Sequence, residues 1–138
     1  PARIAVSGAD GYVSPDWYGL GPDQVPTWNY VAVHLTGRLL PLPQDALEPL
    51  LEAQSAFFEA RLPKVPWTME KMTEETRAKL LRMILPFRFE VERVDSTWKL
   101  GQNKIETARR AAAEAVGGGI GQELDALAQL MRVPPASD

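Results

Sequence analysis

A long stretch of period-two alternation, residues 29–40, constrains the fold of this chain more than any other feature. Its apolar positions share one side of an extended chain: Val31, Val33 and Leu35. The residues between them are more polar, and His34 among them is interpreted as a structural hydrogen-bonding residue. Such alternation is typical of a β-strand with one buried face, so the chain is predicted to contain a sheet.

Two further stretches are predicted to be shorter strands, residues 3–7 and 87–94. The GADG sequence at 8–11 is predicted to form a turn, because two glycines flank an aspartate there. The inner face of the strand at 87–94 is predicted to consist of Phe87, Phe89 and Val91. The alternation breaks at residues 93–94, which indicates a bulge. Three strands can form a sheet but cannot close a barrel.

Two helices are predicted between the second and third strands. The first covers about 45–60, with Asp45 and Glu48 at capping-box spacing. The second covers about 73–84, with Thr73 as its N-cap. Their buried sides are predicted to consist of Leu47, Leu50, Leu51, Gln54, Phe57 and Phe58 in the first, and of Leu80, Leu81 and Ile84 in the second.

Two more helices are predicted after the third strand. An Ala-rich helix begins at Asn103, whose spacing from Glu106 is that of a capping box, and ends at the glycines at 117–119. Residues 109–110, both arginine, are predicted to lie on its exposed face. The last helix covers about 120–131 and is amphipathic. Its inner face is predicted to consist of Leu124, Leu127 and Met131.

Composition narrows the classes of protein that remain. With 138 residues, of which 45% are hydrophobic, the chain suits one globular domain. The formal net charge of -3 lacks the basic footprint of a nucleic-acid binder. The absence of cysteine excludes disulfides, thiolate zinc sites and cysteine nucleophiles, and is compatible with a reducing cytoplasm. A single histidine makes a transition-metal site unexpected, and no apolar run predicts a membrane span.

The chain opens as PARIAVSG, without an initiator methionine and already within strand-like sequence. We expect part of the gene product to be absent from this sequence. If the fold is a barrel, the strands that complete it precede Pro1.

Three segments, in this order and at this spacing, resemble a known family. They are YVSPDWY at 12–18, VPTWNYVAVHLTGR at 25–38 and WKLGQNK at 98–104. Together they are similar to the C-terminal part of PaiB-type proteins, described as FMN-binding, split-barrel negative transcriptional regulators. The resemblance runs from about Arg3 to the C-terminus. At position 101 this chain has glycine, where the family usually has serine.

The resemblance implies an α+β chain, mainly β with helices. The expected fold is an FMN-binding split β-barrel of the pyridoxamine-phosphate-oxidase type, with its N-terminal strands absent from this sequence. Residues 1–100 would form the C-terminal part of that domain, with a helical pair inserted at about 45–84, and residues 101–138 a helical extension. The implied cofactor is FMN, and the implied assembly is a cytoplasmic homodimer with the flavin site at its interface.

The resemblance also implies a set of cofactor-binding residues: Thr27, Trp28, Asn29, Tyr30, Lys99, Gln102 and Asn103. Each also has a structural interpretation. Trp28 suits either a core anchor or a platform for a flavin ring. Thr27, Asn29 and Tyr30 suit either hydrogen bonds to the backbone of the loop or contacts with the pyrimidine edge of a flavin. Asn103 suits a helix N-cap, and the amides of a helix start together with Lys99 would favour an anion such as the FMN phosphate. The aromatic loop at 12–18 suits packing on an apolar edge, a subunit contact, or both.

Three classes of function follow from these observations. The first is an FMN-binding dimer that controls gene expression directly or indirectly; direct nucleic-acid binding is not favoured, because the chain is acidic. The second is a flavin- or haem-dependent oxidoreductase on the same fold, since the cofactor supplies most of the chemistry and no catalytic side chain is evident. The third is an interaction module without a cofactor.

Overall fold

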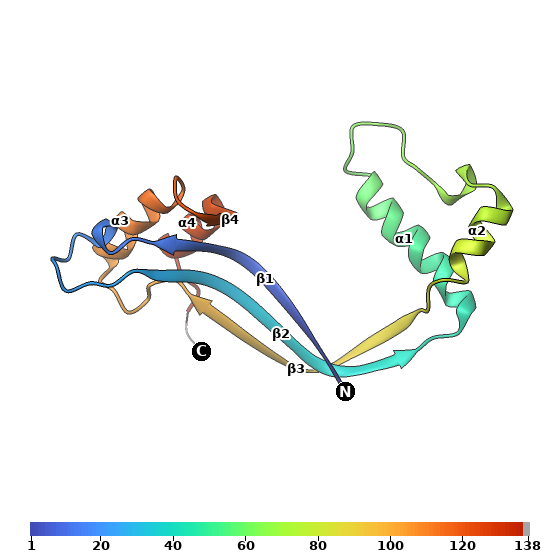
Figure 1. Ribbon diagram of the computed structural model, residues 1–138, viewed down its shortest axis with the longest axis horizontal. Helices are drawn as coiled ribbons and strands as arrows, with labels where there is room; N and C mark the ends of the chain where they lie inside the picture. The colour runs from blue at the N-terminus through green and yellow to red at the C-terminus, as the bar shows by residue number, and fades with distance from the viewer. Residues whose placement is uncertain (137–138) are drawn as a thin grey trace. The chain divides into compact units, whose positions relative to one another are not determined.

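The computed structural model describes residues 1–136, and within this range the chain forms four strands, four α-helices and three short 3-10 helices (Figure 1). In chain order they are β1 (Ala2–Val13), η1 (Pro15–Tyr18), β2 (Thr27–Pro41), η2 (Gln44–Ala46), α1 (Leu47–Glu59), η3 (Met69–Lys71), α2 (Glu74–Leu81), β3 (Phe87–Lys99), α3 (Glu106–Val116), β4 (Gly121–Gln122) and α4 (Leu124–Arg132). One antiparallel sheet combined with helices confirms the predicted α+β class. Across residues 1–136, no helix is both long enough and apolar enough to cross a membrane.

Two compact units make up the chain. The helical unit comprises residues 37–90 with Pro1 and Ala2, and contains α1, α2 and the adjoining ends of β2 and β3. The sheet unit comprises residues 3–36 and the chain from Val91 onward, and contains β4, α3, α4 and most of β1.

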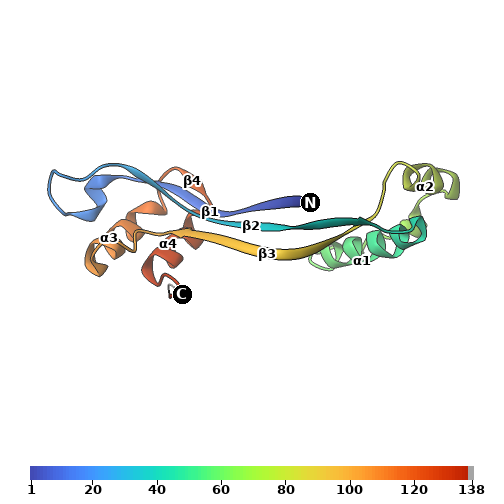
Figure 2. The same cartoon turned by 90° about the horizontal axis from the view of Figure 1, so that it is seen from below.

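The sheet has the strand order β3-β2-β1-β4 and is not closed (Figure 2). The two-residue strand β4 pairs antiparallel with β1, with Gly11 opposite Gly121. The Tyr12 N–H continues this pairing by donating to the Ile120 carbonyl at 2.8 Å. Because β4 takes up residues that the sequence assigns to a helix, α4 begins at Leu124 rather than at 120.

The predicted turn at 8–11 is wrong, because these residues lie within β1. A β-carbon added to Gly8 would lie 3.3 Å from the Val31 Cβ, and one added to Gly11 would lie 2.9 Å from a δ-carbon of Leu124 and another of Leu127. Glycine is therefore needed here because neighbouring side chains approach the strand closely, which is one of its ordinary uses inside a sheet.

The long strand predicted at 29–40 is confirmed as β2, although its two faces are covered more evenly than the alternation predicts. Val31 is buried, whereas Val33 and Leu35 are half-buried, as are His34 and its neighbours on the other face. In β3 the predicted inner face is wrong for two of its three residues: Phe87 and Val91 are 48% and 49% exposed, whereas Phe89 is half-buried. The alternation there is that of a β-strand, but most of the side chains on the predicted inner face are not covered by other parts of the protein.

The hydrophobic core lies in the sheet unit, where β1, β2, η1, α3 and α4 meet. Its members are Ala9, Val13, Tyr18, Val31, Leu100, Ala108, Ala112, Ala113, Val116, Leu127, Ala128 and Met131. The alanines on α3 are small enough for α4 to pack closely, and the two helices lie side by side in both views (Figure 1, Figure 2). Leu127 and Met131 are fully buried and Leu124 packs on the core, which confirms the predicted inner face of the last helix.

Helix α3 ends at Gly117 as predicted, but the predicted N-cap at Asn103 is wrong. The Lys104 N–H donates to the Gly101 carbonyl at 3.0 Å, so residues 101–104 form a turn and the N-cap position falls on Ile105. The prediction that Arg109 lies on an exposed face is also wrong. Its side chain is half-buried, and its Nε donates to the Met131 carbonyl at 2.8 Å, which joins α3 to the end of α4.

In the helical unit, Thr73 caps α2 as predicted, accepting a hydrogen bond from the Thr76 N–H at 3.4 Å. The capping box predicted at Asp45 and Glu48 is wrong, because a 3-10 turn precedes α1 and its N-cap residue is Ala46, which makes no side-chain hydrogen bond. Helix α2 ends at Leu81, earlier than the predicted 84.

The buried stripe predicted for α1 is also wrong in most of its members. Leu47 is buried, but Leu50, Phe57 and Phe58 are 50–57% exposed. The Phe57 and Phe58 rings contact each other edge to face, and the Arg61 guanidinium lies 3.9 Å from the centre of the Phe57 ring. These aromatic side chains therefore pack locally instead of entering a core.

Candidate functional site

A pocket of about 530 Å³ lies in the sheet unit, where the start of β2, the end of β3 and η1 come together. We call it the polar pocket. Its lining residues are Tyr18, Val25, Thr27, Asn29, Lys99, Gly101, Gln102, Asn103 and Lys104. The volume falls within the range of small-molecule and cofactor sites, about 300–1,000 Å³.

Asn29 is the buried polar side chain of this pocket. The residue is 1% exposed, and among residues 1–136 nothing accepts a hydrogen bond from its Nδ2. An unpaired buried amide costs roughly 1–3 kcal/mol, and nearly all such groups in proteins find a partner. Since Asn29 lines an open pocket, a bound ligand with an acceptor atom would supply that partner.

Gly101 and Tyr18 lie beside the Asn29 amide. A β-carbon added to Gly101 would lie 3.8 Å from the Asn29 Nδ2 and 3.9 Å from the Tyr18 hydroxyl oxygen. Gly101 has φ of +79°, a conformation that favours glycine. Burial raises the pKa of the Tyr18 hydroxyl, which keeps it protonated and able to donate. We call Tyr18, Asn29 and Gly101 the pocket floor.

Two lysines give the pocket a positive charge. The Lys99 Nζ donates to the Thr27 Oγ1 at 2.8 Å, and the Lys104 Nζ donates to the Gln24 Oε1 at 2.6 Å. The Lys104 Nζ also lies 5.0 Å from the centre of the Tyr18 ring. We call Thr27, Lys99 and Lys104 the pocket rim. Each lysine donates to an uncharged side chain. Because neither of these partners neutralises the positive charge, both lysines can attract an anion.

Gln102 shapes the loop that carries this rim. Its Oε1 accepts a hydrogen bond from the Leu100 N–H at 2.8 Å, and its Nε2 donates to the Trp98 carbonyl. Both ends of the amide are therefore engaged with the backbone. Asn103 is exposed on the same loop and lines the pocket.

The structure brings five of the seven sequence-predicted site residues into the polar pocket and places the other two, Trp28 and Tyr30, in a separate hollow of about 270 Å³. The Trp28 Nε1 donates to the Asp10 Oδ1 at 3.0 Å, and its ring meets Tyr12 at 65° with centres 6.4 Å apart. Successive side chains of a strand point to opposite faces, which separates Trp28 and Tyr30 from Thr27 and Asn29.

Sequence reasoning missed four members of the pocket: Tyr18, Val25, Gly101 and Lys104. Lys104 belongs to the WKLGQNK segment and could have been included with Lys99. Tyr18 lies in the aromatic loop. Of the two roles expected for that loop, packing on apolar side chains is confirmed, because Tyr18 belongs to the core and Trp17 packs against it. No local signal places that ring beside Asn29.

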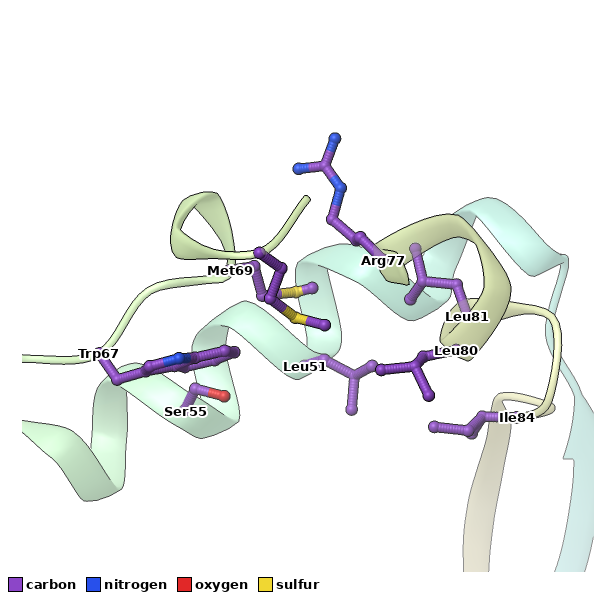
Figure 3. A pocket seen from close by; sticks show the side chains of 9 residues that line it. Leu51, Ser55, Trp67, Met69, Arg77, Leu80, Leu81 and Ile84 are labelled. Carbon is purple, nitrogen blue, oxygen red and sulfur yellow. The ribbon is translucent and has the colours of Figure 1, made fainter. Parts of the chain in front are cut away.

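Another hollow, of about 220 Å³, lies between α1 and α2 in the helical unit (Figure 3). It is mainly apolar, with Trp67, Met69 and Leu81 among its lining residues. Arg77, its only charged lining residue within the described range, pairs with Glu48 at 3.3 Å. Unlike the polar pocket, it is lined by no buried side-chain atom that lacks a hydrogen-bond partner among residues 1–136.

Comparison with known proteins gives two findings. Residues 1–93 match the model of a family described as "Putative FMN-binding domain". The chain is also 32% identical over 104 residues to the Bacillus subtilis (strain 168) protein named "Protease synthase and sporulation protein PAI 2". That match covers 75% of this chain and 49% of the relative, so the chain spans about half the length of the relative. Tyr18 and Asn29 lie within the family match, and the loop at 99–104 follows it.

Proposed function

We propose that the polar pocket is the flavin site of this chain. The premise is that the chain belongs to the PaiB-type family of FMN-binding domains. FMN is the cofactor that this family membership indicates. The observation that carries the proposal is the buried Asn29 amide, which lines a pocket of suitable size and has no acceptor among residues 1–136. A ligand with polar ring atoms and an anionic group fits both that amide and the two lysines.

The residues present fit FMN in charge as well. A phosphate favours cationic partners, and Lys99 and Lys104 supply two of them at the rim. Thr27, Gln102 and Asn103 complete the proposed set, with Gln102 acting through the loop it holds. Trp28 and Tyr30 line the separate hollow, so they are not included among the proposed FMN-binding residues. The bound flavin would supply one- and two-electron chemistry, and these side chains would bind and orient it.

We also propose that the protein is a homodimer. β3 is an edge strand, and apolar side chains of the sheet unit are exposed on it and on β1: Ile4, Val6, Val94 and Trp98 are 38–60% exposed. Long apolar edges of this kind favour pairing with another chain. A flavin site near such an edge could be completed by the partner subunit.

Titration with FMN, followed by flavin fluorescence and native mass spectrometry, tests the flavin and dimer proposals together. We expect one FMN per chain and a mass corresponding to two chains. Replacing Lys99 or Lys104 by alanine should weaken FMN binding roughly 10- to 100-fold for each lysine, since a charge-assisted hydrogen bond is worth about 1.5–3 kcal/mol, and the double variant should bind FMN more weakly than either single variant. Lys79→Ala, at an exposed lysine of α2, is the matched control. A protein that takes up no FMN contradicts the site, and a monomeric mass contradicts the dimer.

The regulatory role is a further part of the proposal. The protein would act in the cytoplasm as a flavin-linked negative regulator of gene expression. Its net charge of -3 favours control through another protein over direct contact with DNA. Deleting the gene should raise the level of specific transcripts, and the wild-type gene, but not one encoding the double lysine variant, should restore them. Unchanged transcript levels would contradict the role, and tight, sequence-specific DNA binding by the purified protein would contradict the indirect route.

A further inference from the structure

The polar pocket is lined by two sets of residues that differ in chemistry. At the floor, Asn29 and Tyr18 are 1% and 4% exposed, and both present uncharged N–H or O–H donors. At the rim, Lys99 is exposed and Lys104 half-buried, and both carry charges that water can solvate. A ligand with one charged end and one uncharged polar end would match this division.

Desolvation decides which end of the ligand belongs at the floor. Moving an ionised group out of water is costly unless a charge of opposite sign compensates it. The donors of the floor itself are neutral. The Lys104 Nζ lies 5.0 Å from the centre of the Tyr18 ring and donates to the Gln24 Oε1, so a phosphate held by the Asn29 and Tyr18 donors would have no cation as a direct hydrogen-bond partner there. An uncharged carbonyl oxygen loses far less hydration and can accept hydrogen bonds from both donors. The floor therefore suits a neutral acceptor, and the rim suits the anion.

Gly101 keeps space free at the floor. A side chain at this position would place its first carbon 3.8 Å from the Asn29 Nδ2 and 3.9 Å from the Tyr18 hydroxyl oxygen. That carbon would therefore occupy the space into which both donors can reach. The φ of +79° adds backbone strain for any residue other than glycine. In this chain, both effects favour glycine at position 101.

We infer that Asn29 and Tyr18, with Gly101 keeping the space between them open, bind an uncharged carbonyl-type acceptor of the flavin ring, while Lys99 and Lys104 bind the phosphate. This inference rests on the proposed function and adds to it the orientation of the cofactor. The floor is then the part of the pocket that recognises the flavin ring. Riboflavin lacks the phosphate but has the same ring, so it should make the same hydrogen bonds at the floor as FMN.

Paired titrations of FMN and riboflavin test this orientation. Tyr18→Phe and Asn29→Ala should weaken both ligands by the same factor, about five- to tenfold each, as for the loss of a neutral hydrogen bond. Lys99→Ala combined with Lys104→Ala should weaken FMN and leave riboflavin unchanged. The flavin absorption bands should shift in the floor variants only, because hydrogen bonds to the ring alter its transitions. Tyr30→Phe, which removes a hydroxyl from the separate hollow, is the matched control and should leave all values unchanged.

The outcomes distinguish this inference from the proposed function. If the wild-type protein binds neither flavin, the flavin site itself is wrong. If the wild type binds both but the floor variants weaken FMN alone, the floor holds the phosphate and the inferred orientation is overturned. Floor variants that bind both flavins like the wild type overturn it too. Thermal melting of each ligand-free variant shows whether it is folded. If Asn29→Ala does not fold, the titrations of Tyr18→Phe alone decide the outcome.

Discussion

Replacing Gly121 by alanine is expected to lower the free energy of unfolding by about 3 kcal/mol or more, since overpacking and backbone strain each cost roughly 1–3 kcal/mol. The added β-carbon would lie 2.1 Å from the Asp10 carbonyl oxygen and 2.6 Å from the Gly11 Cα. These are backbone atoms of β1, directly across the pairing with β4, so they cannot move away without breaking that pairing. Gly121 also has φ of +155°, which L-residues rarely adopt.

Urea denaturation followed by circular dichroism measures this effect, and Gly118→Ala provides the control. Gly118 lies three residues earlier in the same connection, and a β-carbon added there meets no atom within 4 Å. Its replacement should change stability by no more than about 0.5 kcal/mol. If Gly121→Ala unfolds at the same urea concentration as Gly118→Ala, β4 does not pair with β1 as described.

Leu127→Ala is expected to cost about 2–5 kcal/mol of unfolding free energy, the usual range for a buried leucine. Leu127 is fully buried, and one of its δ-carbons would lie 2.9 Å from a β-carbon added to Gly11. It therefore fills the space between α4 and β1, and its truncation leaves a cavity in the core of the sheet unit.

The same substitution at an exposed site separates this cavity effect from the loss of a leucine as such. Leu85 is 70% exposed, so Leu85→Ala should change stability by no more than about 0.5 kcal/mol. Chemical denaturation of both variants under identical conditions gives the comparison. Equal losses at the two positions would mean that α4 does not pack on β1 in solution.

The core and the polar pocket share residues, so these stability predictions also concern the site. Tyr18 belongs to both, and Leu100 of the core precedes Gly101 of the floor. Arg109 is bonded to the last turn of α4, and its Cγ would lie 3.7 Å from a β-carbon at Gly101. The floor is thus supported by the best-packed part of the protein, which favours a preorganised site.

Periodicity and capping chemistry predicted those elements whose signals are local. β2, the N-cap at Thr73 and the buried face of α4 follow from neighbouring residues along the chain. The predictions at 8–11 and Asn103 are wrong for a common reason. At 8–11 the glycines serve close contacts with Val31 and α4, and at Asn103 a turn closed by Gly101 and Lys104 delays the helix. Neither contact is visible in a local sequence pattern.

The candidate site divides in the same way. The sequence by itself determined that Thr27 and Asn29 alternate with Trp28 and Tyr30 along a strand, that the loop at 99–104 is polar, and that the chain resembles an FMN-binding family, because these properties depend on residue order alone. Only the tertiary structure decided that Tyr18, Asn29 and Gly101 share one floor. These residues are far apart in the sequence, and the packing of η1, β2 and the loop after β3 around the core brings their side chains together.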